Sequence, residues 1–226
     1  MFSEFMMQHF PIIAKGGPVM YPIVGLSILG LAIVVERFWV LVLRKSRIVP
    51  QRLLREVQDR VGRGEIGEAI TACKRDDSPL ARLLLAGLEN HRAPRDVIRD
   101  ELEDTGRREA GGLDRYLAIL STIASVEPLL GLLGTVTGMI RMFGALALAE
   151  PGNPSGLAAG IGEALICTAG GLSVAIPAYV FYRWFLSRVQ HLALEMEYDA
   201  LLLLDQLRAA DSYGEEKHPP APEKRA

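Results

Sequence analysis

The stretch SVEPLLGLLGTVTG, from Ser125 to Gly138, is the part of this chain most informative about its fold. It lies in a run from Tyr116 to Ile140 that has no Lys or Arg and whose only charged residue is Glu127. The interior of a soluble helix would normally avoid its proline and three glycines, because these cost about 3 and about 1 kcal/mol there. In lipid, by contrast, small residues let two helix backbones approach closely. The composition of the stretch therefore favours a membrane helix that packs against another helix.

Two further runs of the chain are nearly free of charge. Residues 17–35 carry none, and residues 151–182 carry only Glu163, in a chain of 226 residues with a mean hydropathy of +0.20. Each run approaches or exceeds the ~20 residues that cross a bilayer about 30 Å thick as a helix. Buried helices of a soluble protein are the alternative, which three such runs in so short a chain disfavour. We therefore predict an all-α membrane protein with three transmembrane helices and long helical extensions outside the membrane.

The distribution of basic residues predicts the orientation of these helices. Arginine and lysine are frequent between the first and second runs and after the third, whereas the linker 146–160 has neither. The positive-inside rule therefore places the basic flanks in the cytoplasm. The predicted segments are an outer N-terminal segment 1–16, transmembrane helices 17–43, 116–145 and 159–185, a cytoplasmic helical domain 44–115, an outer loop 146–158, a cytoplasmic helix 186–212 and a disordered tail 213–226. The N-terminus has no basic region and no small-residue cleavage site, so we expect no cleaved signal peptide.

The cytoplasmic segments are predicted to be helical throughout. Ser78-Pro79 should separate two short amphipathic helices, and Gly111-Gly112 should bend a third helix that runs toward the second span. Past the third span, apolar residues recur at helical spacing and need a partner, most simply another helix of the same chain. These residues are Val189, Leu192, Met196, Leu203 and Leu207.

Several classes of function are disfavoured. A net charge of −2 favours no nucleic-acid partner. Cys73 and Cys167 lie in very different settings and suit neither a disulfide nor a metal site. The four histidines are scattered, and no His-Glu pair has the spacing of zinc ligands. We therefore expect no metal, and an intramembrane enzyme ranks low.

Small and polar residues mark the second and third runs as interior helices. The residues expected at helix contacts are Gly131, Gly134, Gly138 and Pro128 in the second run and Gly170, Gly171 and Pro177 in the third. Replacing Gly134 or Gly171 by leucine is expected to block assembly of an oligomer, because it would force helices apart. Thr135 and Thr168 by themselves would be interpreted as hydroxyls bonded to the preceding turn of their own helix.

The carboxyl groups of the two runs are the candidate functional groups. A carboxylate at membrane depth costs roughly 2.5–3.5 kcal/mol on insertion scales, so such residues tend to mark ion or proton pathways. Glu163 could instead be a hydrogen-bonded carboxyl near the outer end of its span. Glu127 could instead pair with Arg115 of a neighbouring chain or cap the helix at Pro128. Arg141 is most simply an interface anchor whose charge reaches the headgroups.

These residues carry a resemblance to a known family. The stretches LLGLLGTVTGMIRMF and IGEALICTAGGLSVAIPAYVFYRWF, in this order, resemble the MotA/TolQ/ExbB proton-channel family. The similarity is greatest to the ExbB and TolQ branch, and it extends to VVERFWVL and to GEIGEAITAC…SPLARLLLAGL. Three spans in 226 residues also suit ExbB or TolQ better than MotA, which has four.

The resemblance implies a subunit of a bacterial inner-membrane motor, with its N-terminus in the periplasm and its C-terminus in the cytoplasm. It implies a ring, most often a pentamer, whose second and third spans surround the single membrane helix of an ExbD- or TolR-like partner bearing an aspartate. Thr135 and Thr168 match the pore threonines of the family, and Glu163 matches its glutamate. Protons would be the coupling ion, with no other cofactor, and the work would reach TonB or TolA.

Two features depart from the pattern. At Glu127 the family more often has a small residue, so a second carboxyl could extend the proton exit path or mark a specialised subfamily such as a gliding motor. Glu163 and Thr168 are five residues apart and point roughly 140° from each other, so they cannot share one narrow face. A non-conducting scaffold that only holds a partner in the membrane is the alternative function.

Overall fold

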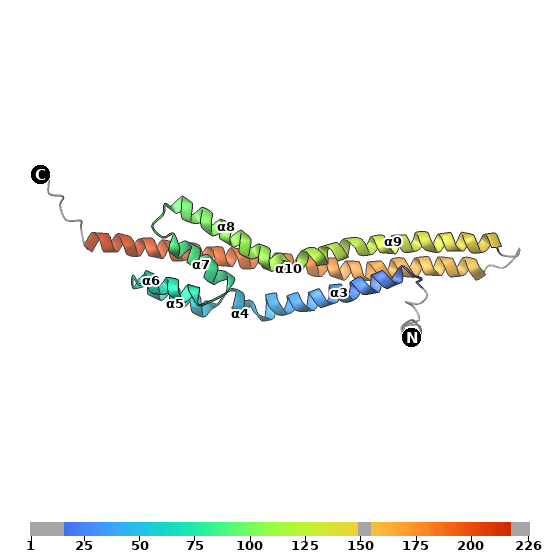
Figure 1. The fold of residues 1–226 in the computed structure, drawn as a ribbon, viewed down its shortest axis with the longest axis horizontal. Coiled ribbons are helices and arrows are strands. Elements are labelled where there is room, and N and C mark those ends of the chain that lie inside the picture. The colour runs from blue at the N-terminus through green and yellow to red at the C-terminus, as the bar shows by residue number, and fades with distance from the viewer. Residues whose placement is uncertain (1–15, 149–154, 218–226) are drawn as a thin grey trace. The chain divides into compact units, whose positions relative to one another are not determined.

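The computed structural model describes residues 16–148 and 155–217, which form helices and contain no strand (Figure 1). The helices are α3 (Met20–Phe38), the π-helical turn η1 (Trp39–Leu43), α4 (Lys45–Ile48), α5 (Gln51–Gly62), α6 (Ile66–Lys74), α7 (Pro79–Glu89), α8 (Arg95–Asp114), α9 (Leu117–Leu148) and α10 (Ser155–Lys217). They belong to two compact units. The membrane unit is the described part of residues 1–38 and 115–186, and the polar unit is the described part of residues 39–114 and 187–226.

The predicted all-α membrane fold is confirmed. Three stretches are long and apolar enough to cross a bilayer, namely Met20–Leu43, Leu117–Gly144 and Ala158–Arg208. The third lies within α10, a single helix of 63 residues that contributes to both units. Since about 20 residues suffice to cross a bilayer, α10 continues well beyond the membrane. The assembly of these helices into a ring stays a prediction.

Several expected segment boundaries differ from those of the structure. The expected loop 146–158 is too long, because α9 continues to Leu148 and α10 begins at Ser155. The tail expected to be disordered from residue 213 is helical as far as Lys217. Gly111-Gly112 lie inside α8, and the interruption before the second span falls at Arg115-Tyr116 instead. Residues 1–15, 149–154 and 218–226 lie outside the described part of the chain.

In the membrane unit, α3 packs against both α9 and α10. Gly30 of α3 lies beside Ile123 of α9, where a Cβ on the glycine would meet the isoleucine side chain at 3.6 Å. Met20 and Ile23 of α3 are buried with Cys167 of α10. Small residues on each helix thus let three apolar helices share one core.

In the polar unit, α5, α6, α7 and α8 follow one another and pack as successive neighbours. Ser78 caps α7, its hydroxyl accepting a hydrogen bond from the Ala81 amide at 3.2 Å, which agrees with the predicted break at Ser78-Pro79. Gly87 of α7 lies against leucines of α8 and α10, so three helices meet there. All five apolar residues predicted on the last helix are buried within the same chain: Val189, Leu192, Met196, Leu203 and Leu207.

Candidate functional site

Glycines bring α9 and α10 into backbone contact. Each of four glycines faces the other helix so closely that a Cβ would meet its atoms at or below about 3 Å. The contacts are Gly138 with Gly160, Gly134 with Cys167, Gly131 with Thr168, and Gly171 with the carbonyl of Glu127. Rising numbers on one helix meet falling numbers on the other, so the helices are antiparallel. We call this line of contacts the glycine seam.

The glycine seam lies within one chain. Replacing its residues should therefore disturb the subunit itself before any contact between subunits. Gly170, the remaining predicted packing glycine, faces α3 instead, where a Cβ would meet the flexible end of Met20 at 3.0 Å. Of the two prolines, Pro128 lies inside α9, and Pro177 lines a small hollow of about 190 Å³ with Ser27 and Gly30 of α3.

The two predicted pore threonines lie in different surroundings. The Thr168 hydroxyl is half-buried in the glycine seam, 3.2 Å from the carbonyl of Gly131 and 3.3 Å from that of Ala164. Its single proton can therefore bridge the two helices or bond its own helix. The Thr135 hydroxyl donates to the carbonyl of Leu132, one turn earlier in α9, at 2.7 Å. The structure thus brings Thr168, but not Thr135, into a contact between helices.

Glu163 is held by an arginine. The guanidinium of Arg141 on α9 lies 2.7 Å from the Glu163 carboxylate, whose side chain is 14% exposed. Arg141 thus has a partner inside the chain, while 51% of its side chain is exposed, and its role as an interface anchor stays a prediction. The pair brings together residues near the facing ends of two antiparallel helices.

The turn before α3 closes over this ion pair. Gly17 has a φ of +69°, a conformation that glycine adopts without steric cost. A Cβ there would overlap Oε1 of Glu163, and it would lie 3.2 Å from the Arg141 guanidinium. The thiol of Cys167 donates to the carbonyl of Gly16 at 2.7 Å and ties the same turn to α10. Sequence reasoning missed Gly16 and Gly17, because nothing local marks them as neighbours of Glu163.

Glu127 lies apart from these groups. It is fully buried, and neither of its carboxyl oxygens has a hydrogen-bond partner among the described residues. The expected cap of a helix end at Pro128 is wrong, since Pro128 lies inside α9. The pairing with Arg115 of a neighbouring chain stays a prediction. Glu163 and Arg141 therefore form one site, between α10 and α9. Glu127 forms a second site by itself, fourteen residues before Arg141 on α9.

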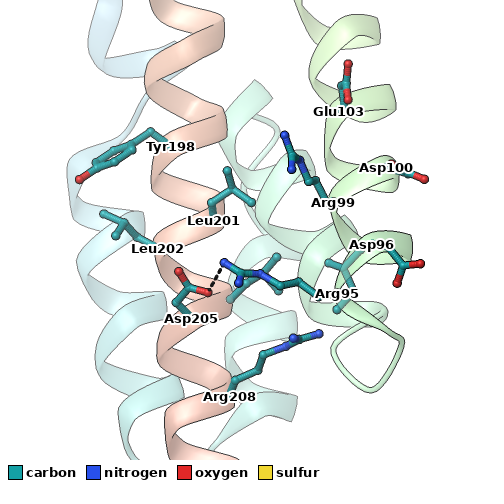
Figure 2. Close-up of a pocket in the computed structure, with 12 residues that line it drawn as sticks. Arg95, Asp96, Arg99, Asp100, Glu103, Tyr198, Leu201, Leu202, Asp205 and Arg208 are labelled. Carbon is teal, nitrogen blue, oxygen red and sulfur yellow. Dashed lines mark hydrogen bonds and ion pairs between the residues drawn. The ribbon is translucent and has the colours of Figure 1, made fainter.

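The polar unit holds a separate groove of about 910 Å³ between α8 and α10. Figure 2 shows Arg95 of α8 reaching toward Asp205 of α10, and their charged atoms lie 3.2 Å apart. The groove is lined by charges of both signs, with Arg95, Arg99 and Arg208 beside Asp96, Asp100, Glu103 and Asp205. This mixture favours neither an anionic nor a cationic ligand, and the groove contains none of the predicted site residues.

No cluster of three or more His, Cys, Asp or Glu side chains able to hold a metal ion occurs within residues 16–148 and 155–217. The membrane site brings together carboxyl, hydroxyl, thiol and guanidinium groups, of which carboxyl groups can bind and release protons.

Comparison with known proteins identifies the family. A sequence profile described as the MotA/TolQ/ExbB proton channel family matches residues 75–198. A Synechocystis protein named as the biopolymer transport protein ExbB-like 1 is 38% identical over 179 residues, which are 76% of this chain and 68% of that protein. The Tol-Pal system protein TolQ of Haemophilus influenzae is 32% identical over 177 residues, 71% of this chain and 77% of TolQ. An ExbB homologue of Methanothermobacter thermautotrophicus is 31% identical over 176 residues, 77% of this chain and 62% of that protein. The chain belongs to the MotA/TolQ/ExbB proton channel family, in its ExbB/TolQ branch.

Proposed function

We propose that this chain is the channel subunit of an inner-membrane motor that uses the proton motive force to energise TonB- or Tol-dependent processes at the outer membrane. Its membership of a proton channel family carries the proposal, together with relatives named biopolymer transport and Tol-Pal system proteins. The subunit would act with a single-span partner of the ExbD or TolR kind. The alternative is that the chain belongs to a gliding-type motor of the same family and works by the same mechanism.

The membrane unit contains groups suited to passing protons. The Glu163 carboxylate and the Thr168 hydroxyl lie on one stretch of α10, and both contact α9. A carboxylate so costly to place in lipid favours a role in proton movement over a packing role. Thr135, whose hydroxyl bonds its own helix, is proposed to face the partner helix in the ring.

We propose that the polar unit lies in the cytoplasm and that both the N-terminus and residues 149–154 lie in the periplasm. The polar unit carries most of the basic residues, while residues 142–160 have none, as the positive-inside rule predicts. The ring, expected to be a pentamer, would then place the Arg141–Glu163 pair near its periplasmic end.

The first experiment is co-expression of the full chain with a neighbouring reading frame that encodes one membrane helix bearing an aspartate. The mass of the purified complex in detergent should correspond to a ring of this chain around fewer partner chains. The complex is then placed in liposomes and proton flux is measured under an imposed gradient. A ring that never captures such a partner would favour the scaffold alternative.

Variants test the residue roles. Glu163→Gln and Thr168→Val are expected to reduce flux about a hundredfold while the ring forms normally, because proton transfer by a positioned group contributes factors of this order. Thr122→Val is the matched control, because its hydroxyl bonds only its own helix, to the carbonyl of Ala118 at 2.9 Å. Full flux in both Glu163→Gln and Thr168→Val contradicts these roles. Wild-type function that is unaffected by a protonophore indicates a scaffold.

A further inference from the structure

Glu127 is a buried carboxyl group that the proposed function leaves unexplained. It is 0% exposed, and both of its oxygens lack a hydrogen-bond partner among the described residues. Burial of a carboxyl group without a hydrogen bond destabilises the fold, and buried polar groups are nearly always hydrogen-bonded, so the presence of Glu127 needs an explanation. A leucine or alanine at this position would pack against the neighbouring helices without that cost.

No cation from the neighbouring helices is placed to compensate a charge on Glu127. The sequence has no charged residue in α3 from Met20 to Val35, none in α9 from Leu117 to Ile140 other than Glu127, and none in α10 from Ala164 to Tyr182. Among the other titratable groups of these stretches, Cys167 donates its thiol to a backbone carbonyl, and Tyr21 and Tyr179 are more than half exposed. Tyr182 is half-buried and lies eleven residues beyond Gly171. The carboxyl is therefore far less costly to bury as the uncharged acid than as a carboxylate.

The position of Glu127 relates it to the other candidate site. Its backbone carbonyl faces Gly171 of α10, at the end of the glycine seam that is farther from Glu163. One helical turn along α9, the carbonyl of Gly131 faces the Thr168 hydroxyl at 3.2 Å. Glu163 lies on the other side of Thr168, and the eight residues from Glu163 to Gly171 correspond to about 12 Å along α10. The backbones of Glu163 and Glu127 therefore lie on either side of Thr168 along the packed helices α9 and α10.

We propose that Glu127 is a second proton-binding site of each subunit, separated from Glu163 by the Thr168 hydroxyl. In its carboxylate form Glu127 takes a proton from a hydronium ion that reaches it from the Glu163 side. The resulting acid then gives this proton to a water molecule on the opposite side, so each cycle returns the subunit to its starting charge. The two backbone positions are about 12 Å apart along the helix axis. In the proposed path, water between the two carboxyl groups carries the proton across this separation. This inference rests on the proposed function.

Proton flux through the complex of full chain and partner in liposomes tests the proposal. Glu127→Gln keeps the size and polarity of the side chain but holds no exchangeable acid, and it should lower flux about tenfold or more. Glu127→Asp should keep more flux than Glu127→Gln, because it retains an acid. The mass of the ring and the midpoint of thermal unfolding should be unchanged or raised in Glu127→Gln, since no bond is lost. Flux in Glu127→Gln within about twofold of wild type overturns the proposal.

Infrared spectroscopy gives a readout that a structural role would not change. Spectra of the wild-type complex recorded across a pH titration should contain a carboxylic-acid carbonyl band that is absent in Glu127→Gln and present in Glu163→Gln. A spectrum of Glu127→Gln that retains every such band overturns the proposal. If wild-type liposomes show no flux above protein-free ones, the proposed function fails, and the infrared band then decides whether Glu127 binds a proton.

Discussion

At the scale of the residue, the surroundings of Glu163 are determined mainly by one neighbour, Arg141. Its carboxylate is paired with Arg141 at 2.7 Å and is covered by the backbone of Gly17. Arg141 and Glu163 lie at the same level along the paired helices. Arg141 is seven residues before the end of α9, and Glu163 is eight residues after the start of α10, which runs antiparallel to α9. That similar spacing is the one signal in the sequence that could have identified Arg141 as the partner.

Replacing Gly17 by alanine should affect function more than stability. A Cβ at Gly17 overlaps the flexible end of Glu163, which can rotate away at little cost, so the loss of stability should be the strain of a positive φ, about 1 kcal/mol. Gly64→Ala is the matched control, because Gly64 has a φ of +78° and a Cβ there would have nothing within 4 Å. Both variants should lose similar stability by thermal unfolding in detergent, but only Gly17→Ala should lose proton flux, by several-fold. Equal flux in the two variants would show that the turn does not position Glu163.

The thiol of Cys73 should be almost unreactive in the folded protein. Burial, followed by the negative charges of Asp76 and Glu56, raises its pKa from 9.0 to about 11. Because the thiolate is the reactive form, only about one thiol in a thousand is ionised at pH 8, compared with about one in ten for a pKa of 9.0. Iodoacetamide labelling, located by peptide mass spectrometry, should be about a hundredfold slower than in the chain unfolded in detergent, and its rate should rise with pH up to about 11. Equal labelling rates in the two states would contradict this burial.

At the scale of the elements, close packing of α9 on α10 depends on the absence of side chains. The glycine seam allows helix backbones to approach, and backbone contacts of this kind replace the hydrophobic driving force that lipid does not supply. The spacing of these glycines predicts helix contacts. It does not distinguish a contact within one subunit from a contact between subunits, and only the loss of the latter would directly block oligomer assembly. In the structure they join two helices of one subunit.

Gly171→Ala should therefore destabilise the subunit. The new Cβ would lie 2.5 Å from the backbone carbonyl of Glu127, which cannot rotate away, so the helices must separate at a cost of about 1–3 kcal/mol. Gly162→Ala on the same helix is the control, since nothing lies within 4 Å of its Cβ, and it should be neutral or stabilising by up to about 1 kcal/mol. Thermal unfolding of the two variants in detergent measures the difference. A loss of stability in both, or in neither, would show that the seam does not determine packing.

At the scale of the whole molecule, charge and apolar surface are divided between the two units. Large apolar side chains of the membrane unit are widely exposed, among them Leu129, Ile140, Leu165 and Ile176 at 62–65%. These surfaces suit lipid or neighbouring subunits. Residues 39–114 and 187–226 carry 20 of the 25 Lys and Arg, as expected of a domain that is retained in the cytoplasm.

Reporter fusions should reveal the orientation that this division predicts. Alkaline phosphatase, which is active only in the periplasm, should be active when inserted within residues 149–154, whereas green fluorescent protein fused after Ala226 should fluoresce in the cytoplasm. Exchanging the two reporters provides the control, because both signals should then disappear. Active phosphatase at the C-terminus would invert the proposed topology.

Features that depend on short stretches of chain could be predicted from the sequence. The three spans follow from run length and hydropathy, because each run must satisfy its own backbone in lipid as a helix. The break at Ser78-Pro79 follows from a capping residue and a proline, which act within one helical turn. The family, too, could be identified from motifs of adjacent residues.

Which distant residues meet could be learned from the tertiary structure and not from the sequence. The pairing of Arg141 with Glu163, the cover provided by Gly17 and the isolation of Glu127 all depend on the register between α3, α9 and α10. That register is set by the sum of many backbone contacts along the glycine seam, and a helical period specifies only which residues share a face. A shift of one residue would turn each side chain by about 100° and bring different partners together, which no local pattern can specify.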